Sequence, residues 1–549
     1  MNTPKSNTSI WLALENPVFR RLWLATVISG TCVAAHNTAA FSALGTMGNS
    51  AFLISQMSTL SALPFALFTL PAGALADMID RKKILCAVSL WQASIAICLT
   101  ILGLTHLLNP YIILASVFLF NLGFAFGSPT SSSVIAEMVS KDELASANTL
   151  GGLQINIAGM IGPVLGGLLI PVMGASFVFG ANGLGFLLMF LAILQWRRVR
   201  AQTPVPLDAF FATVTTAINY ARYTPGIKVV LARNAFFSFF ISIIPALMPV
   251  VGLKELHLDP AKLGYLFTSM GIGSVIGAVF VIPWARARFS PNTLTIYANL
   301  LLVLNLFLMA HVQRPYLFLL VAAVAGAGWT LSSTELWIAG QRAMPDWARG
   351  RMNATIIMIS QAATALGGAT WGAAASKAGV VPTFLVAGAL AILFWVVTHV
   401  VLQKRLSIDF TASLNFEPAA VTIFSHDLDP RRLTQAKDNP VSVTTEFLID
   451  SACREQCIEL MREARLIYLR NGASGWHLYE DLTRSNKFLM EVTSPSWNEF
   501  LRQRERMTKD EKEVMDKLRN LHVGAHRLGE SPRVSIDKQV LKKRVRFWE

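Results

Sequence analysis

Polar side chains that could carry a proton or bind a substrate interrupt several long apolar runs of this sequence. His36 and Asn37 are neighbours in the middle of the first run, and Glu335 is a carboxylate well inside a later one. Ionisable groups within a membrane are costly, so each is a functional candidate by default. Histidine titrates near physiological pH, and burial favours the neutral form of a carboxyl group, so either could carry a proton. The alternatives are a structural hydrogen bond for His36 and, for Glu335, an ion pair with Arg342 or Arg233.

Three amide side chains lie in further apolar runs. Asn156 and Gln361 occupy matched positions 205 residues apart (361 − 156). Asn121 is the one strongly polar side chain at the centre of the fourth predicted membrane span, in the second half of the run Ile84–Ala136. Facing amides could line a cavity for a small-molecule substrate. The alternative is tight helix packing through amide hydrogen bonds, which would leave no substrate role for these side chains.

A second group of residues has the spacing expected of a gate. Gly73 would let its helix approach a neighbour closely, and Asp77 could then accept hydrogen bonds from the positive N-terminal end of a helix in another part of the chain. Together with Arg81 and Lys82 this predicts a latch that holds the cytoplasmic side of the protein closed. The alternative is a loop that carries only topogenic charge.

A cluster of helix-interrupting residues marks another apolar run. Gly162, Pro163, Gly166 and Gly167 permit close helix packing and a change of helix direction. We expect a bend at the interface between two parts of the protein, with plain helix packing as the alternative.

Membrane helices must position these residues, because the composition excludes an ordinary soluble protein. Of 549 residues, 53% are hydrophobic and 15% charged, against about 25% charged in soluble domains. Three runs without a charged residue are long enough for two spans each, with turns predicted near residues 45–50, 106–110 and 171–175. Six shorter runs fit one span each. The sequence therefore predicts twelve transmembrane helices. The runs are Leu22–Ala76, Ile84–Ala136, Leu144–Trp196, Asn234–Leu253, Leu263–Ala285, Phe289–Gln313, Pro315–Thr334, Met352–Ser376 and Ala378–Gln403.

The distribution of Lys and Arg predicts the orientation of the chain. With a cytoplasmic N-terminus, 18 of these residues lie in inside segments and four in outside loops (Lys254, Lys262, Arg314 and Lys377). The positive-inside rule then places both termini in the cytoplasm. The net charge of +14 is spread thinly, so we expect membrane lipid rather than nucleic acid as a partner.

Glycine and amide positions recur at an offset of 204–205 residues. Gly73 corresponds to Gly277, Gly162 to Gly367 and Gly167 to Gly372, each at the same place in the predicted topology. We therefore expect two six-helix repeats, an arrangement typical of transporters that bind substrate between their halves. The sequence has no Gly-x-x-x-x-Gly-Lys phosphate-binding motif, which argues against an ATP-driven pump.

Several motifs resemble a known superfamily. Residues 73–83 read Gly-Ala-Leu-Ala-Asp-Met-Ile-Asp-Arg-Lys-Lys and resemble the signature loop of the major facilitator superfamily, although Met78 and Asp80 depart from it. Residues 162–167 resemble the Gly-Pro-x-x-Gly-Gly element of its antiporters. Many of those antiporters carry an arginine in the fourth span, which is uncharged here.

Residues 137–148 and 341–351 resemble the exporter branch that includes the enterobactin exporter and the transmembrane secretion effectors. The resemblance implies a major facilitator fold in a bacterial inner membrane. It also implies secondary active, proton-coupled efflux of small siderophore- or drug-like amphipathic molecules by alternating access.

The C-terminal region has the composition of soluble protein. Residues 403–549 hold 25 Lys and Arg and 22 Asp and Glu, and their pattern predicts the strand and helix order βαββαβ of a cytoplasmic α+β ferredoxin-like domain. The second helix is predicted over Trp497–Leu521 and the last strand over Arg533–Val540. It resembles the dimeric α/β-barrel domains related to antibiotic-biosynthesis monooxygenases, which implies that it could form a homodimer. Phe500 and Arg504 stand at the usual histidine positions of those domains. His477, Trp476 and Trp497 could bind a ligand or simply pack in the core.

The predicted organisation has five parts: 1–198 and 228–403 as six-helix halves, 199–227 as the loop between them, 404–440 as a linker, and 441–549 as the soluble domain. We expect a transporter without cofactor or metal, and not an enzyme. The alternatives are a membrane-anchored monooxygenase-like enzyme and a ligand-sensing scaffold that acts through the C-terminal domain.

Overall fold

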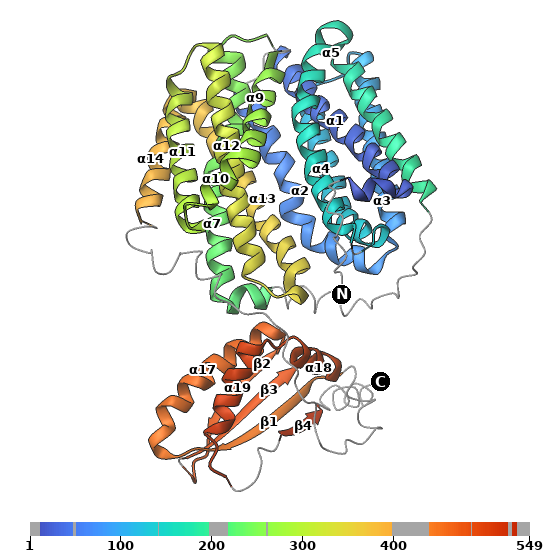
Figure 1. The fold of residues 1–549 in the computed structure, drawn as a ribbon. Helices are drawn as coiled ribbons and strands as arrows, with labels where there is room; N and C mark the ends of the chain where they lie inside the picture. The colour runs from blue at the N-terminus through green and yellow to red at the C-terminus, as the bar shows by residue number, and fades with distance from the viewer. Residues whose placement is uncertain are drawn as a thin grey trace, which may run out of the picture. The chain divides into compact units, whose positions relative to one another are not determined.

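Long apolar helices make up the first of two units into which the chain divides (Figure 1). The computed structural model describes residues 11–47, 51–140, 142–196, 218–259, 262–397, 439–484, 486–524 and 530–534. The membrane unit comprises residues 1–207, 229–339 and 353–409, and the second unit comprises 208–228, 340–352 and 410–549. Each unit is considered by itself below.

The first half of the membrane unit holds five helices. They begin where the sequence supplies helix-start residues: Asn16 caps the first by accepting from the Val18 and Phe19 amides, and Asn109 caps the fourth, each followed by a proline. The elements are η1 (Leu12–Glu15), α1 (Pro17–Thr46), α2 (Ala51–Met78), α3 (Arg81–Leu104), α4 (Pro110–Met138) and α5 (Leu144–Gln195).

The second half is more interrupted. Two of its helices run on into π-helical turns, η2 (Val251–Glu255) and η4 (Gly277–Val281), a feature that often marks functional segments. Its α-helices are α7 (Pro225–Ile241), α8 (Ile243–Val250), α9 (Leu263–Ile276), α10 (Ile282–Arg286), α11 (Pro291–His311), α12 (Pro315–Arg342), α13 (Asp346–Ala378) and α14 (Val380–Val396).

Nine helical segments of the described chain are long and apolar enough to cross a membrane. One of them, Ser146–Gln195, is 50 residues long and contains a non-helical residue, Gly174, with φ 81° and ψ 163°. The turns predicted near residues 45–50, 106–110 and 171–175 coincide with the end of α1, the end of α3 and this kink. Since α14 is short and α13 is less apolar, the count of twelve spans stays a prediction.

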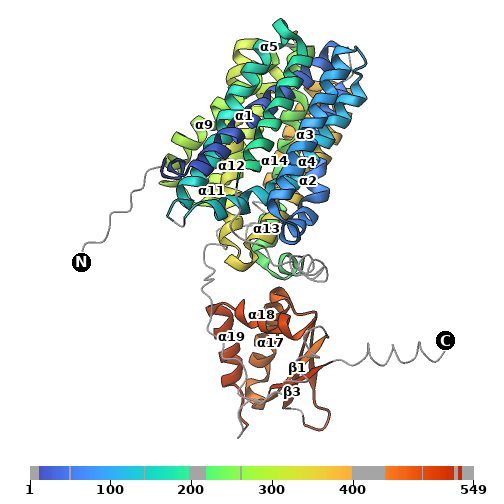
Figure 2. The same ribbon diagram turned by 90° about the vertical axis from the view of Figure 1, so that its right-hand side faces the viewer.

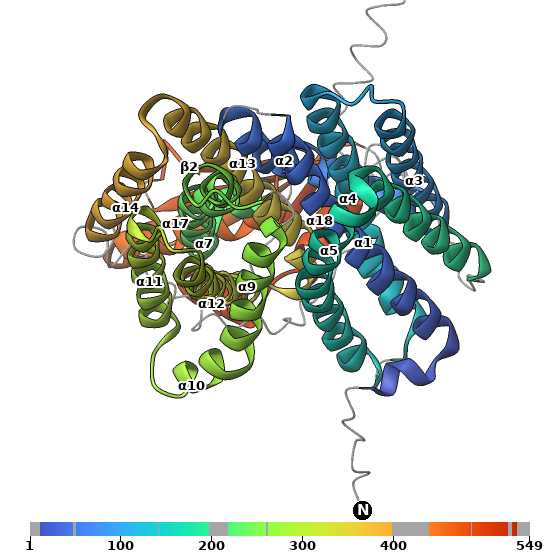
Figure 3. The same cartoon turned by 90° about the horizontal axis from the view of Figure 1, so that it is seen from above.

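The helices of the membrane unit form two groups, α1–α5 and α7–α14, as the view from above shows (Figure 3). Within the first group, α5 packs against α1 and α3, and α2 packs against α4. Between the groups, α5 contacts α9 and α2 contacts α8. Helix α1 also contacts α9, so α1, α2 and α5 are helices through which the first group meets the second.

The second unit contains a four-stranded antiparallel sheet with the order β2-β3-β1-β4. Its strands are β1 (Val441–Leu448), β2 (Gly475–Glu480), β3 (Lys487–Ser494) and β4 (Glu530–Val534). Residue Val443 pairs with Val492 on β3 and with Pro532 on β4. Helices α17 (Arg454–Asn471) and α19 (Lys509–Asn520) cover one face of the sheet (Figure 2).

The element order of this sheet unit follows the predicted alternation with one correction. The second helix was expected to be continuous from Trp497 to Leu521, but the structure divides it into α18 (Trp497–Glu505) and α19. Thr508 forms a capping box with Glu511 and so begins a new helix. Most of the last predicted strand, residues 533–540, lies outside the described residues.

Two segments that connect membrane helices, residues 208–228 and 340–352, belong to the second unit. Tyr220 is buried, and its hydroxyl donates to the Ala343 carbonyl oxygen at 3.2 Å, next to the end of α12. Tyr223 packs against the sheet unit's core, which includes Cys457, Met461 and Phe488. The loop predicted between the halves therefore contributes side chains to this unit rather than acting only as a connector.

Candidate functional site

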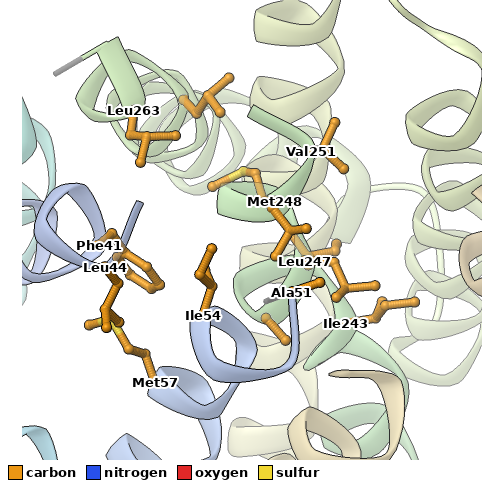
Figure 4. Close-up of a cluster of buried hydrophobic side chains, with 14 of the residues drawn as sticks. Phe41, Leu44, Ala51, Ile54, Met57, Ile243, Leu247, Met248, Val251 and Leu263 are labelled. Atoms are coloured by element: carbon orange, nitrogen blue, oxygen red, sulfur yellow. The ribbon is translucent and has the colours of Figure 1, made fainter. Parts of the chain in front are cut away.

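One large hydrophobic cluster joins the two halves at a single end of the membrane unit (Figure 4). We call it the gate cluster. Phe41 of α1 stacks on Phe267 of α9 with ring centroids 5.4 Å apart, and a Cβ at Gly45 would lie 2.8 Å from Leu253. The cluster thus closes the end at which α1 ends and α2 begins. Its central residues are Phe41, Leu44, Ala51, Ile54, Met57, Ile243, Leu247, Met248, Val251 and Leu263.

Three hydrophobic clusters at the opposite end each belong to one half. Two of them lie in the first half, around Phe19 with Leu150 and around Leu22 with Trp196. The third lies in the second half, around Ile282 and Leu294. Apolar packing therefore joins the halves at the gate cluster, while these three clusters stabilise each half on its own.

Small residues let α5 approach both α1 and α9. A Cβ at Gly162 would overlap Ala34 of α1, and one at Gly166 would lie 3.0 Å from the Ala35 carbonyl oxygen. On another side of α5, a Cβ at Gly264 of α9 would overlap the Pro163 carbonyl oxygen, close to Gly167. These residues thus lie at close helix contacts, and the non-helical residue of α5 is Gly174. The predicted bend at residues 162–167 stays a prediction.

A second seam of small residues joins α13 to α2 and to the α7–α8 segment. A Cβ at Gly372 would overlap the Ser55 hydroxyl of α2, and one at Gly367 would overlap the Phe239 carbonyl oxygen. Gly367 thus meets the first helix of its own half, as Gly162 does. Gly372 meets the second helix of the other half, as Gly167 does.

The residues of the predicted latch bind within the first half. Arg81 donates to Glu137 of α4 at 2.6 Å, and Lys82 Nζ donates to the carbonyl oxygens of Leu194 and Trp196 at the end of α5. These contacts tie the start of α3 to α4 and α5. The side chain of Asp77 lies outside the described residues, so its role as a latch stays a prediction.

Gly73 does not make the expected close approach in this conformation. A Cβ at this position would meet nothing within 4 Å, whereas a Cβ at its predicted repeat partner Gly277 would lie 3.0 Å from Ala327. Asp80 has a role that the sequence reasoning did not assign: its side chain caps α3 by accepting from the Lys82 and Lys83 amides. An aspartate directly before a helix start was the signal that could have indicated this.

Glu335 on α12 is buried and forms an ion pair with Arg286 at the end of α10. The Nε of Arg286 donates to Oε1 at 2.7 Å, and the two side chains are 41% and 3% exposed. The partner is therefore neither Arg342 nor Arg233, which we had considered. Arg233 instead donates to the side-chain oxygen of Asn292.

His36 is buried inside the first half, away from the seams. Its Nδ1 lies 3.1 Å from Nδ2 of Asn182 on α5, and its ring contacts Phe120 and Phe179 at centroid distances of 5.2 and 4.7 Å. This geometry is that of a hydrogen bond between helices. Sequence reasoning missed Asn182, because 146 residues separate it from His36.

The remaining polar candidates differ in their exposure. Asn37 and Asn156 are exposed, and Gln361 is half-buried on α13. Asn121 donates from Nδ2 to the Val117 carbonyl oxygen of its own helix at 2.8 Å. A cavity lined by these amides stays a prediction.

The three side chains predicted as possible ligand contacts, Trp476, His477 and Trp497, lie in different surroundings in the second unit. Trp476 packs against the core beneath the helices, whereas His477, the next residue on β2, points to the opposite face and stacks on Tyr479. Trp497 packs with Phe500, and the Arg504 guanidinium lies over the Phe500 ring at 5.1 Å. Among the described residues, no three His, Cys, Asp or Glu side chains are grouped to hold a metal ion.

A protein-family comparison matches nearly the whole chain. The family model described as transmembrane secretion effector matches residues 8–540. Macrolide efflux protein A of Streptococcus pyogenes is 22% identical over 397 residues, covering 70% of this chain and 96% of that protein. Enterobactin exporter EntS of Shigella flexneri is 23% identical over 386 residues, covering 68% of this chain and 88% of the exporter.

Solved transporter structures share the fold of the membrane unit. A bacterial homolog of the human lysosomal transporter Spinster, in an inward-facing and unoccupied conformation, aligns with a TM-score of 0.55 at 14% identity over 74% of this chain and 99% of that one. A bacterial homologue of the iron transporter ferroportin in an inward-facing state aligns with a TM-score of 0.54 at 15% identity, over 69% and 98% of the two chains.

Proposed function

The chain belongs to the transmembrane secretion effector family, whose members act in efflux, and we propose that it exports small amphipathic molecules by alternating access between its two halves. The relatives supply the substrate class, since one is a macrolide efflux protein and another an enterobactin exporter. Both names refer to organic molecules with polar and apolar parts. The substrate of this chain belongs to the same broad class.

The observation that carries this proposal is the asymmetry of packing between the halves. The gate cluster joins them at one end, whereas the three clusters at the other end each lie within one half. Two seams of small residues, α5 with α9 and α2 with α13, let the halves approach closely. Small residues reduce interlocking of side chains, so such seams suit rigid-body rocking of one half against the other.

We infer twelve spans in two repeats from the way the helices divide. The kink at Gly174 splits α5 into two spans, and Gly379, with φ 89°, separates α13 from α14. Gly162 and Gly367 each pack closely against the first helix of their own half. Gly167 and Gly372 each contact the second helix of the other half. This correspondence supports a duplication. Under this proposal, the unlike surroundings of Gly73 and Gly277 reflect divergence of the two copies.

The orientation in the inner membrane follows from charge. With 18 of 22 membrane-region Lys and Arg residues in the predicted inside segments, the termini are cytoplasmic. The gate cluster then lies at the outer end. The state described here is accordingly closed to the outside, the state in which an exporter takes up substrate from the cell or the inner leaflet.

We propose Glu335 as the proton carrier that couples efflux to the proton gradient. Protonation would neutralise the buried carboxylate and remove the charge that Arg286 binds. Arg286, with its 41% exposed side chain, can then turn toward water without leaving a second buried charge. Release of the proton in the other state would restore the pair, so each cycle moves one proton.

Efflux from everted membrane vesicles tests the function. Vesicles from cells that express the full chain should accumulate a fluorescent macrolide when a proton gradient is applied, and a protonophore should abolish the accumulation. As a matched control, a cross-linked variant with cysteines at Gly45 and Leu253 should hold the gate cluster closed and stop transport until it is reduced. Equal accumulation by vesicles without the protein would contradict the proposed function for this substrate class.

A further inference from the structure

An apolar pocket of about 530 Å³ lies among α7, α13 and α14 in the second half of the membrane unit. Aromatic rings form much of its wall. Phe239 and Phe240 of α7 approach Trp371 of α13 with centroid distances of 5.3 and 6.0 Å, and Phe394 of α14 lies 6.2 Å from Phe240. Trp371 also belongs to the gate cluster, and Phe239 and Phe240 pack against that cluster, so the pocket borders the gate, whereas Glu335 and Arg286 do not line it.

The polar groups of the pocket wall are already bonded within the protein. Trp371 Nε1 donates to the Phe239 carbonyl oxygen at 3.0 Å, and the Thr370 hydroxyl donates to the Gly367 carbonyl oxygen at 3.0 Å. A polar ligand group would lose its hydrogen bonds to water here and find no free donor in either side chain. The wall therefore suits a hydrocarbon chain rather than the polar part of an exported molecule.

The outer side of the pocket is formed by an apolar helix that faces away from the unit. Leu390 and Leu393 of α14, and Val397 directly after it, line the pocket and are 44%, 59% and 39% exposed. In a bilayer, exposed apolar surface of a membrane helix contacts acyl chains. A lipid chain thus has direct access to the pocket from the membrane.

The pocket adjoins an irregular point in a membrane helix, which we call the α7–α8 break. Helix α7 ends at Ile241 and α8 begins at Ile243, although Ser242 between them keeps helical angles (φ −60°, ψ −19°) and its N–H still donates to the Ser238 carbonyl oxygen. Pro245 has no N–H to donate to the Ile241 carbonyl oxygen. The Phe239 carbonyl oxygen accepts from both Ser242 Oγ and Trp371 Nε1. The break therefore lies against the pocket wall, and the segment beyond it, α8, carries Leu247 and Met248 of the gate cluster.

We propose that this pocket binds an acyl chain of a membrane lipid, and that the bound chain supports the α7–α8 break and with it the closed gate cluster. The proposal rests on the proposed function only in placing the membrane unit in a bilayer. An acyl chain lying against Phe239 and Trp371 would fill the pocket. The end of α7 could then not shift into the pocket. Loss of the acyl chain would let α8 move relative to α7 and loosen the contacts of Leu247 and Met248.

Fluorescence quenching by brominated lipid tests the binding. The full chain is reconstituted in phosphatidylcholine vesicles whose acyl chains carry bromine, and the Trp371→Phe variant identifies the share of the emission that comes from Trp371. In Ala374→Phe, the new ring fills the pocket, and we expect bromine quenching of Trp371 to fall about twofold or more. Val386→Phe, at an exposed position of α14 outside the pocket wall, should leave the quenching unchanged. Ala374→Leu serves if the larger side chain prevents folding.

A distance measurement tests the effect on the gate. Spin labels are attached at cysteines that replace Met47 and Lys254 on either side of the gate cluster, after the native cysteines have been replaced by serine. In vesicles whose chains carry bulky methyl branches, the wild-type distance distribution should broaden. The distribution should not broaden in Ala374→Phe, because the introduced phenyl ring occupies the pocket in place of an acyl chain.

The outcomes separate the parts of the proposal. Equal quenching in wild type and in both Ala374 variants would overturn the lipid site. Relief of quenching by an added macrolide would show that the pocket takes exported molecules and would overturn the lipid assignment, while leaving the proposed efflux function intact. Lowered quenching together with an unchanged gate distance in branched lipid would overturn the coupling to the gate.

Discussion

Arg286 and Glu335 form an ion pair in which one partner meets solvent and the other does not. Their atoms Nε and Oε1 lie 2.7 Å apart, yet the side chains are 41% and 3% exposed. A buried carboxylate is tolerated here because the guanidinium supplies both charge and a hydrogen bond. The pair joins α10 to α12 inside one half, so a change in either partner alters that half without directly breaking the gate cluster.

Replacing Glu335 with glutamine should uncouple transport. Glu335→Gln keeps size and hydrogen bonding but cannot titrate, so uphill efflux should be lost while energy-independent exchange of substrate continues. Proton and substrate fluxes in proteoliposomes at several pH values measure this. If the variant still concentrates substrate against a gradient, the pair with Arg286 is structural and coupling lies elsewhere.

Arg286→Met provides the comparison for stability. It leaves the Glu335 carboxylate buried without a counter-charge, at a cost on the order of 3 kcal/mol for fully buried pairs. The exposure of Arg286 reduces that cost. Thermal unfolding should therefore show a lower midpoint for Arg286→Met than for Glu335→Gln.

Two helix glycines predicted to permit close packing should respond in opposite ways to replacement by alanine. Gly162→Ala places a Cβ against Ala34 and 2.6 Å from the Thr31 carbonyl oxygen, so α5 must move off α1 at a cost of about 1–3 kcal/mol. Gly73→Ala meets nothing within 4 Å and should be neutral or stabilising by about 0.5–1 kcal/mol. Unfolding midpoints in detergent measure the difference. A destabilised Gly73→Ala would show that this helix does approach a neighbour.

Local patterns predicted the helix ends better than the partners of individual side chains. Charge-free runs and capping residues such as Asn109 depend on a few neighbouring positions, and α4 begins at the following proline. The contacts of Glu335 with Arg286 and of His36 with Asn182 span 49 and 146 residues. Which arginine or amide lies nearby depends on how the helices pack, and periodicity does not contain that information.

Removing the charge of Asp77 should slow the transport cycle without unfolding the protein. If Asp77 accepts hydrogen bonds from a helix N-terminus in the other half, Asp77→Asn weakens that contact, worth about 0.3–1 kcal/mol, and leaves the core intact. Transport rate at matched expression is the measurement. Arg81→Gln is the control, because Arg81 binds Glu137 within the first half and its loss should lower stability more than rate. A wild-type rate for Asp77→Asn would contradict the latch.

Cys457 should be unreactive toward alkylating reagents in the folded protein. Burial in the core under α17 raises the pKa of its thiol to about 11 from 9.0. Iodoacetamide at pH 8 should therefore leave Cys457 unmodified, as mass spectrometry of digested protein can show.

The raised pKa of the Cys457 thiol also means that the unfolded chain releases this proton more readily. The sheet unit should lose stability as pH rises from 9 toward 11 and gain nothing below pH 9. In Cys457→Val that loss should be smaller, and equal pH dependence in both proteins would exclude the thiol as its cause.

The C-terminal region expressed alone from about Asn439 should be soluble and dimeric, through the sheet face that α17 and α19 leave uncovered. Trp476 and Leu478 point to the helices, so Tyr479, which is 49% exposed, stands on the open face. Tyr479→Glu should then give a monomer by light scattering, because a charge would be buried between two sheets. Leu466→Glu, at a comparably exposed position on α17, should remain dimeric. A wild-type fragment that is monomeric at high concentration would contradict the barrel interpretation. Deleting the region from the full chain should leave some transport, since both halves of the membrane unit and the gate cluster lie before it.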